Sequence, residues 1–159
     1  MIKHKMRKIN RQLSREESIE ILAKAEYGVL ATISSDGCPY ATPISYVHHG
    51  GNIYFHSAKS GHKIDNFQHD ANVSFAVVGE TEPVFDDFFS TYYESVIIFG
   101  RISEVTEAPV KTEILLLFAE KYLSEHMAKA NDAIQRTLPA VSIWLLQVEH
   151  MTGKAKRRK

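Results

Sequence analysis

The alternation of hydrophobic and polar residues predicts a structure made mainly of β-strands. Short runs rich in β-branched and aromatic residues are separated by Gly, Asn, Asp and Ser, which is typical of strands joined by turns. The first three runs follow one another through tight turns, so we expect them to pair in antiparallel fashion. Six strands are predicted, over residues 28–33, 39–47, 53–57, 73–78, 91–102 and 140–148.

Four other segments have the pattern of helices. Ser14 and Glu17 form a capping-box pattern, which predicts a helix that ends near residue 25. Residues 106–109 open a helix whose apolar residues recur at i, i+4, i+7 and i+8, the spacing of a core-facing stripe. Shorter helices are predicted over residues 62–67 and 125–135.

Residues 80–89 have neither pattern. They hold Pro83 and three phenylalanines, so we expect an irregular segment that packs on another part of the protein. Sequential antiparallel strands with few helices favour a closed or nearly closed barrel, because closure hides the sheet edges. A Rossmann sheet is disfavoured, since no Gly-x-Gly-x-x-Gly sequence follows a strand.

Composition narrows the class of protein. A chain of 159 residues is the usual size of one domain, so residues 1–159 are predicted to fold as a single unit. No apolar run approaches the roughly 18 residues that span a bilayer, and the first residues lack the apolar region of a signal peptide. We therefore expect a cytoplasmic protein without a membrane partner. Cys38 is the only cysteine, which excludes an internal disulfide.

The charges are segregated although the formal net charge is zero. Residues 1–11 and 154–159 hold ten of the 19 Lys and Arg residues and no acidic residue, which leaves an acidic body. Solvated, flexible ends are the expected outcome. The ends could also fold back on the acidic body or contact an anionic ligand. Nucleic acid is not expected as a partner.

The segment 55–63 has the composition of an anion-binding site. It runs from a strand end through a loop with Gly61 into a helix start, and it holds Lys59 and Lys63 one helical turn apart. These ammonium groups, two hydroxyls, a histidine and the free amides of a helix N-terminus could converge on one phosphate. An ordinary polar loop is the alternative that these residues leave open.

Five ordered segments extend this interpretation: residues 27–32, 36–46, 53–63, 91–96 and 152–155. In them the sequence resembles the pyridoxamine 5′-phosphate oxidase-like FMN-binding split-barrel superfamily, and within it the nitroimidazole-resistance (Nim) reductase branch. The resemblance implies a mainly β fold, a six-stranded antiparallel split β-barrel with Greek-key character and flanking helices. It also implies a homodimer whose interface holds two flavins, each touched by both subunits.

The resemblance further implies roles for individual residues. The flavin ring would lie along a strand formed by Thr42, Pro43, Ile44 and Ser45. The ribityl phosphate would be held by Ser57, Ala58, Lys59, Gly61, His62 and Lys63. Aromatic residues that would pack near the flavin from the other subunit, or else form plain core or interface, are Tyr92, Tyr93 and Trp144.

His56 is the candidate catalytic residue, because the Nim-like branch has a histidine beside the flavin. It would position a substrate or donate a proton; a histidine satisfied by a backbone partner at a strand end is the alternative. No metal site is expected, since neither the His48-His49 pair nor the His62/His69 pair makes a specific ligand set.

The expected function is flavin-dependent oxidation or reduction of a small organic substrate, with FMN as cofactor and NAD(P)H as a candidate electron donor. FAD, a deazaflavin or haem are alternative cofactors. The competing interpretation is a non-catalytic flavin- or haem-binding module for sensing or stress, with basic termini that contact an anionic partner.

Overall fold

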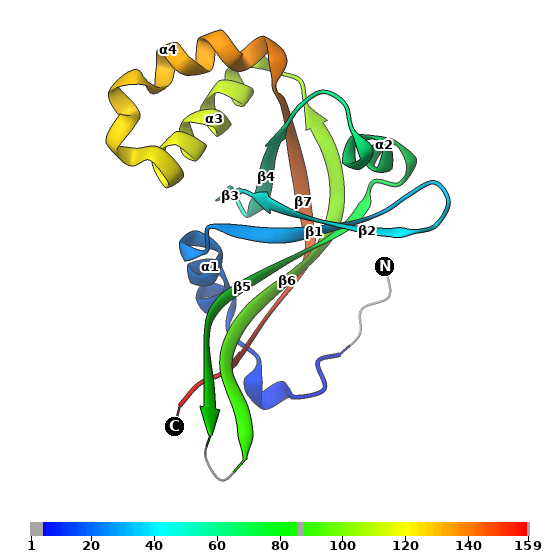
Figure 1. Cartoon of the computed structure of the whole chain (residues 1–159), viewed down its shortest axis with the longest axis vertical. Coiled ribbons are helices and arrows are strands. Elements are labelled where there is room, and N and C mark those ends of the chain that lie inside the picture. The colour runs from blue at the N-terminus through cyan, green and yellow to red at the C-terminus, as the bar shows by residue number, and fades with distance from the viewer. Residues whose placement is uncertain (1–4, 86–87, 159) are drawn as a thin grey trace.

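The computed structural model describes residues 5–85 and 88–158 and is built around one seven-stranded antiparallel sheet (Figure 1). The order of the strands is β2-β1-β5-β6-β7-β4-β3. The strands are β1 (Tyr27–Ile33), β2 (Pro39–Ser45), β3 (Val47–His49), β4 (Asn52–Ser57), β5 (Asn72–Phe85), β6 (Phe89–Val105) and β7 (Ser142–Lys156). The α-helices are α1 (Arg15–Lys24), α2 (His62–His69), α3 (Ala108–Leu123) and α4 (Met127–Thr137). Short 3₁₀ turns are η1 (Ile9–Arg11), η2 (Ser124–His126) and η3 (Leu138–Ala140).

The prediction of a mainly antiparallel β fold with flanking helices is confirmed, but the sheet has seven strands where six were expected. The run predicted over residues 39–47 divides at Tyr46, which is fully buried. The Tyr46 hydroxyl donates to the Leu22 carbonyl at 2.8 Å, and the Tyr46 amide donates to the Tyr122 hydroxyl at 3.0 Å. These contacts take the Tyr46 amide out of the strand ladder and separate β2 from β3. In the described residues β2 and β3, the two outermost strands, do not pair with each other, so the sheet is open and not the closed or nearly closed barrel that was expected.

The β5–β6 hairpin corrects the prediction for residues 80–89. The described part of this segment is regular: β5 pairs with β6 as far as Phe85 and Phe89, with one register shift between Val78 and Thr81. Backbone hydrogen bonds between β5 and β6, and not buried side chains, hold the outer part of this arm, which projects at the bottom of Figure 1. The phenylalanines of the arm are not buried: Phe85, Phe88 and Phe89 are 71%, 62% and 91% exposed, and the Phe85 and Phe89 rings pack on each other with centres 5.2 Å apart.

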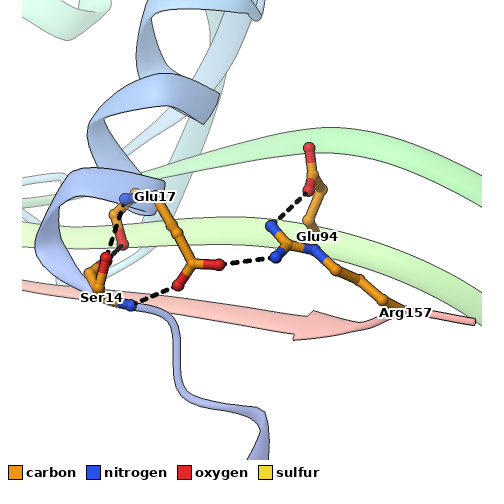
Figure 2. A network of polar contacts seen from close by, with 5 residues as sticks. Ser14, Glu17, Glu94 and Arg157 are labelled. Carbon is orange, nitrogen blue, oxygen red and sulfur yellow. Dashed lines mark hydrogen bonds and ion pairs between the residues drawn. The ribbon is translucent and has the colours of Figure 1, made fainter. Parts of the chain in front are cut away.

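The basic C-terminal segment is not a flexible tail over the part that forms β7. The strand continues to Lys156, which pairs with Tyr93 of β6. Figure 2 shows the next residue, Arg157, between Glu17 and Glu94, at 2.6 Å and 3.5 Å from their carboxylate oxygens. This end of the chain therefore folds back on the acidic body. Both ion pairs lie at the surface, where solvent screening keeps their contribution to stability small.

Helix α1 covers the sheet beside β7, and the capping box predicted at its start is present. The Ser14 amide donates to the Glu17 carboxylate at 2.8 Å, and the Glu17 amide donates to the Ser14 hydroxyl at 3.1 Å (Figure 2). A side chain at Gly153 would collide with the Ser18 hydroxyl and come within 2.9 Å of Leu13 Cβ. Glycine at this position therefore permits the close approach of helix and strand.

Helices α3 and α4 form a separate layer at the top of Figure 1. Ile114 and Phe118 of α3 are buried with Val47, Val105 and Ile143 in a second hydrophobic cluster, apart from the main core under α1 and α2. The predicted stripe of α3 is thus confirmed in its centre, whereas Val110 at its start is 37% exposed. This arrangement leaves the facing sides of α3 and α4 close to β2 and β4, where the candidate site lies.

Lys121 of α3 joins these two layers. Its ammonium lies 3.2 Å from the Tyr46 carbonyl oxygen, 3.4 Å from the Leu22 carbonyl oxygen and 4.0 Å from the centre of the Tyr46 ring. Burial lowers the pKa of Lys121 from 10.5 to about 8. The amine is thus held in a position where its charged form is disfavoured relative to the unfolded chain.

We expect Lys121 to make the protein more stable as the pH rises from about 8 to 9.5. In this range the unfolded chain keeps the proton that folded Lys121 releases, so the free energy of unfolding increases with pH, by on the order of 1 kcal/mol for a partly exposed amine. Urea unfolding of the wild type and of Lys121→Met should show this rise in the wild type alone. Equal pH dependence in both proteins would contradict the assignment.

Candidate functional site

Strand β2 and the segment that follows β4 lie side by side and form the candidate site. At one end of β2 the Tyr40 ring packs on the His62 ring, with 4.1 Å between their centres. At the other end Ser45 and His56 line the same cavity, and between these ends β2 approaches β4. We call this region, formed by residues 40–45 and 56–63, the β2 trough. Because β2 is the last strand of the sheet, its outer backbone edge borders the trough without a strand partner.

The N-terminus of α2 provides a positively polarised end to the β2 trough. Gly61 has a φ of +129°, a conformation that a residue with a side chain rarely adopts. In the described part of the chain no side chain caps the helix, and the amides of His62 and Lys63 have no hydrogen-bond partner. Together with the ammonium groups of Lys59 and Lys63, these amides are suited to hold a phosphate.

Helix α2 is fixed to the β1–β2 hairpin by two hydrogen bonds. The Ser34 hydroxyl and His62 Nε2 are 2.8 Å apart, and the buried Asn66 amide donates to the Thr32 hydroxyl at 2.9 Å. One ring nitrogen of His62 is therefore used within the chain. No role was predicted for Ser34 or Asn66, since they contact residues 28 and 34 positions away and no local pattern marks them.

Ser57 and Trp144 lie beneath the loop rather than at its surface. The Ser57 hydroxyl donates to the Ala58 carbonyl at 2.7 Å and accepts from the Trp144 indole at 3.1 Å. Trp144 is 7% exposed, and its ring packs on Phe67 with centres 4.8 Å apart. Trp144 is thus a core residue that supports the loop from below, because a buried indole N–H needs a partner. The Ser57 hydroxyl is thus already engaged within the chain.

The strand residues expected along the flavin ring alternate between two faces. Pro43 and Ser45 are exposed, whereas Thr42 and Ile44 point toward the interior, where Ile44 packs against the main core. Thr42 Oγ1 is buried and has no hydrogen-bond partner in the described residues. A buried hydroxyl without a partner costs about 1–3 kcal/mol. A polar ligand atom that reached this position would remove that cost.

His56 lies at the junction of the β2 trough and the adjoining cavity. Its ring packs edge-on against Phe118, with 4.7 Å between the centres. Burial, and then the charge of Lys63, lower the pKa of His56 below its usual value. The lowered pKa favours the neutral ring, which can donate or accept a hydrogen bond.

Tyr92 and Tyr93 are not near the β2 trough of their own chain. They lie on the β5–β6 arm beside the C-terminal strand, where the ammonium of Lys156 is 5.4 Å from the Tyr92 ring centre and that of Lys154 is 5.8 Å from the Tyr93 ring centre. Figure 1 shows this arm projecting at the bottom of the view, away from α2 at the upper right. Only a second chain could bring these tyrosines to the β2 trough.

The described residues offer neither a metal site nor a membrane-spanning helix. In the stretches 5–85 and 88–158 no group of three or more His, Cys, Asp and Glu side chains is placed to hold a metal ion. Over the same stretches, none of the helices combines the length and the apolar character that crossing a membrane requires.

Comparison with solved structures supports the fold. A protein from Bacteroides thetaiotaomicron assigned to 5-nitroimidazole antibiotic resistance superimposes with a TM-score of 0.78 and 21% identity, over 91% of this chain and 86% of that one. A flavocytochrome from Azotobacter vinelandii gives a TM-score of 0.81 and 18% identity, over 98% and 73%. A FAD- and haem-binding protein from Mycobacterium smegmatis gives 0.81 and 18%, over 93% and 74%.

The comparison of sequences identifies the family. Among curated proteins none matches the chain. The family model described as pyridoxamine 5′-phosphate oxidase matches residues 14–155, which include α1, the strands β1 to β6, all of β7 except its last residue, and the whole β2 trough. The resemblance noted in the sequence is thereby confirmed, and the chain belongs to the pyridoxamine 5′-phosphate oxidase family.

Proposed function

We propose that the protein binds FMN in the β2 trough and uses it to oxidise or reduce a small organic substrate. The observation that carries the proposal is the N-terminus of α2, where unpartnered amides and two lysines lie at the end of an open strand edge. Lys59, Lys63 and the amides of His62 and Lys63 would hold the phosphate. The flavin ring would lie along residues 42–45, and when bound it supplies the electron transfer.

A homodimer would complete this site. The outer face of β5 and β6 exposes Val78 and Ile97, which are 61% and 42% accessible, and it continues into the arm that carries Tyr92 and Tyr93. A second copy on this face would cover apolar surface and could bring its tyrosines to the β2 trough of the first. Sedimentation equilibrium should then give about twice the mass of the 18.0 kDa chain.

Purified protein tests the proposed function directly. We expect it to be yellow, to release FMN on heating, as identified by mass, and to be bleached by NADH or NADPH and re-oxidised by a nitroaromatic compound or a quinone. Release of FAD or a deazaflavin would replace FMN as the assigned cofactor. A yellow protein that no donor reduces would show a binding module, and a colourless protein that takes up only haem would overturn the proposal.

The choice of a nitroaromatic acceptor follows from the B. thetaiotaomicron relative, and the haem control follows from the A. vinelandii and M. smegmatis relatives. The basic termini give less support to a module that contacts an anionic partner. At the C-terminus, Arg157 and Arg158 are already paired with Glu17, Glu94 and Glu82 of the same chain.

A further inference from the structure

The Ser34 hydroxyl and the His62 ring form a pair at the phosphate end of the β2 trough. Ser34 directly follows β1 and is only 8% exposed. Its Oγ lies 2.8 Å from Nε2 of His62, the first residue of α2. The Tyr40 ring packs on the His62 ring, with 4.1 Å between their centres. The imidazole is therefore held in one orientation, at its Nε2 edge and on one face.

The hydrogen bond between Ser34 and His62 fixes which ring nitrogen carries the proton. In a neutral imidazole one nitrogen donates and the other accepts, and a serine hydroxyl can do either. In the described residues His62 Nε2 is the only hydrogen-bond partner of the Ser34 hydroxyl. If Ser34 accepted from Nε2, its own buried O–H would have no acceptor, which is unfavourable. Ser34 therefore donates to Nε2, and the proton of the ring lies on Nδ1.

Nδ1 of His62 and the backbone amide of the same residue are both available at the N-terminus of α2. In the described part of the chain neither group has a hydrogen-bond partner. Nδ1 is the ring nitrogen closer to the backbone, whereas Nε2 on the far side of the ring is turned to Ser34. A phosphate held at the His62 amide can therefore accept a second hydrogen bond from Nδ1–H.

We propose that Ser34 is a positioning residue of the phosphate site, whose hydroxyl holds the His62 ring as an Nδ1–H donor to the flavin phosphate. This inference rests on the proposed function and adds to it a basis for the choice between FMN and riboflavin, which lacks the phosphate. With the proton on Nδ1, the neutral ring adds a donor to those of Lys59 and Lys63. With the proton on Nε2, Nδ1 would present a lone pair to the phosphate and repel it.

The tautomer is measured in flavin-free protein. Nitrogen-15 NMR of the histidine rings at pH 8 distinguishes an Nδ1–H from an Nε2–H imidazole, and His62→Gln assigns the signal. We expect the Nδ1–H form in the wild type and loss of this preference in Ser34→Ala. Ser35→Ala is the matched control, since Ser35 lines the same cavity but is exposed, and it should leave the tautomer unchanged. An Nε2–H ring in the wild type would overturn the proposal.

Affinities for FMN and riboflavin test the consequence for binding. At pH 8, Ser34→Ala should bind FMN about tenfold more weakly, the low end of the loss for a hydrogen bond to a charged group. Riboflavin affinity should stay unchanged, and Ser35→Ala should leave both affinities unchanged. An equal loss for FMN and riboflavin would show a damaged trough and overturn the proposal, as would an unchanged FMN affinity.

The pH dependence gives a readout that a purely structural role of Ser34 would not produce. Lowering the pH to 5.5 favours imidazolium, which donates from both nitrogens with or without Ser34, so the difference between wild type and Ser34→Ala should shrink to about twofold or less. A tenfold difference that persists at pH 5.5 would overturn the proposal. Other titratable groups around the ring are the same in both proteins, so their effects cancel in the ratio of dissociation constants. They are Asp36 and Cys38 between β1 and β2, Tyr40 of β2, and Lys63 and Asp65 of α2.

The flavin site and the role of Ser34 can fail separately. If FMN binds but the tautomer and the affinity do not depend on Ser34, the flavin site stands and the positioning role is rejected. If no flavin binds, the proposed function is rejected, and titration with phenyl phosphate decides the inference. Binding of phenyl phosphate that weakens in Ser34→Ala but not in Ser35→Ala would keep the positioning role, and equal binding in both variants would reject it.

Discussion

Replacing Lys63 with alanine is expected to weaken FMN binding by roughly 10- to 100-fold. Lys63 is half-buried in the first turn of α2, beside the unpartnered amide of His62. A hydrogen bond between an ammonium and a phosphate contributes about 1.5–3 kcal/mol, which corresponds to this loss of affinity. Quenching of flavin fluorescence during titration of the stripped protein measures the dissociation constant.

A second readout separates a lost ligand from a damaged fold. Because the charge of Lys63 helps to lower the pKa of His56, the His56 pKa should rise in Lys63→Ala, as followed by NMR titration without flavin. Lys24→Ala removes an exposed lysine at the far end of α1 and serves as the matched control, with unchanged affinity. FMN affinity in Lys63→Ala equal to that of Lys24→Ala would reject the phosphate site at α2.

The parts of the fold that could be predicted are those with a local cause. The capping box at Ser14 and Glu17 needs only four consecutive residues, and the runs of β-branched residues define β1 and β4 without any knowledge of their partners. The division of the second strand could not be predicted in this way. It depends on hydrogen bonds from Tyr46 to α1 and α3, which lie 24 and 76 positions away in the sequence.

The candidate site, too, could be predicted only where its residues are close together in the sequence. The loop over residues 56–63 is contiguous, so its lysines, glycine and helix start could be recognised together. The hydrogen bond that supports this loop from below could not be predicted, because the indole of Trp144 reaches Ser57 from 87 positions away in the sequence. For the same reason the cavity under α3 and α4 had no signal in the sequence. Its lining comes from strands and helices far apart along the chain, and on α3 the periodic residues predicted only a packed face.

Gly100 marks the place where the structure is expected to be least tolerant of a side chain. It lies at the register shift between Phe99 and Gly100 in the antiparallel pairing of β6 with β7. A Cβ there would collide with the Gln147 carbonyl oxygen and come within 2.9 Å of Leu146 Cδ1. The oxygen belongs to the backbone of the central strand ladder, so it cannot move without breaking strand pairing.

We therefore expect Gly100→Ala to lower the free energy of unfolding by about 3 kcal/mol or more, beyond the usual cost of overpacking a core. Gly37→Ala is the matched control. Gly37 has a φ of +82°, and a methyl group on its Cα would meet no atom within 4 Å, so alanine there encounters backbone strain alone, at about 1 kcal/mol. Urea unfolding followed by tryptophan fluorescence compares the two, since Trp144 is buried in the folded chain. If both variants lost the same free energy of unfolding, β6 and β7 would be free to separate at Gly100. The paired strands β6 and β7 would then not form the rigid centre of the fold.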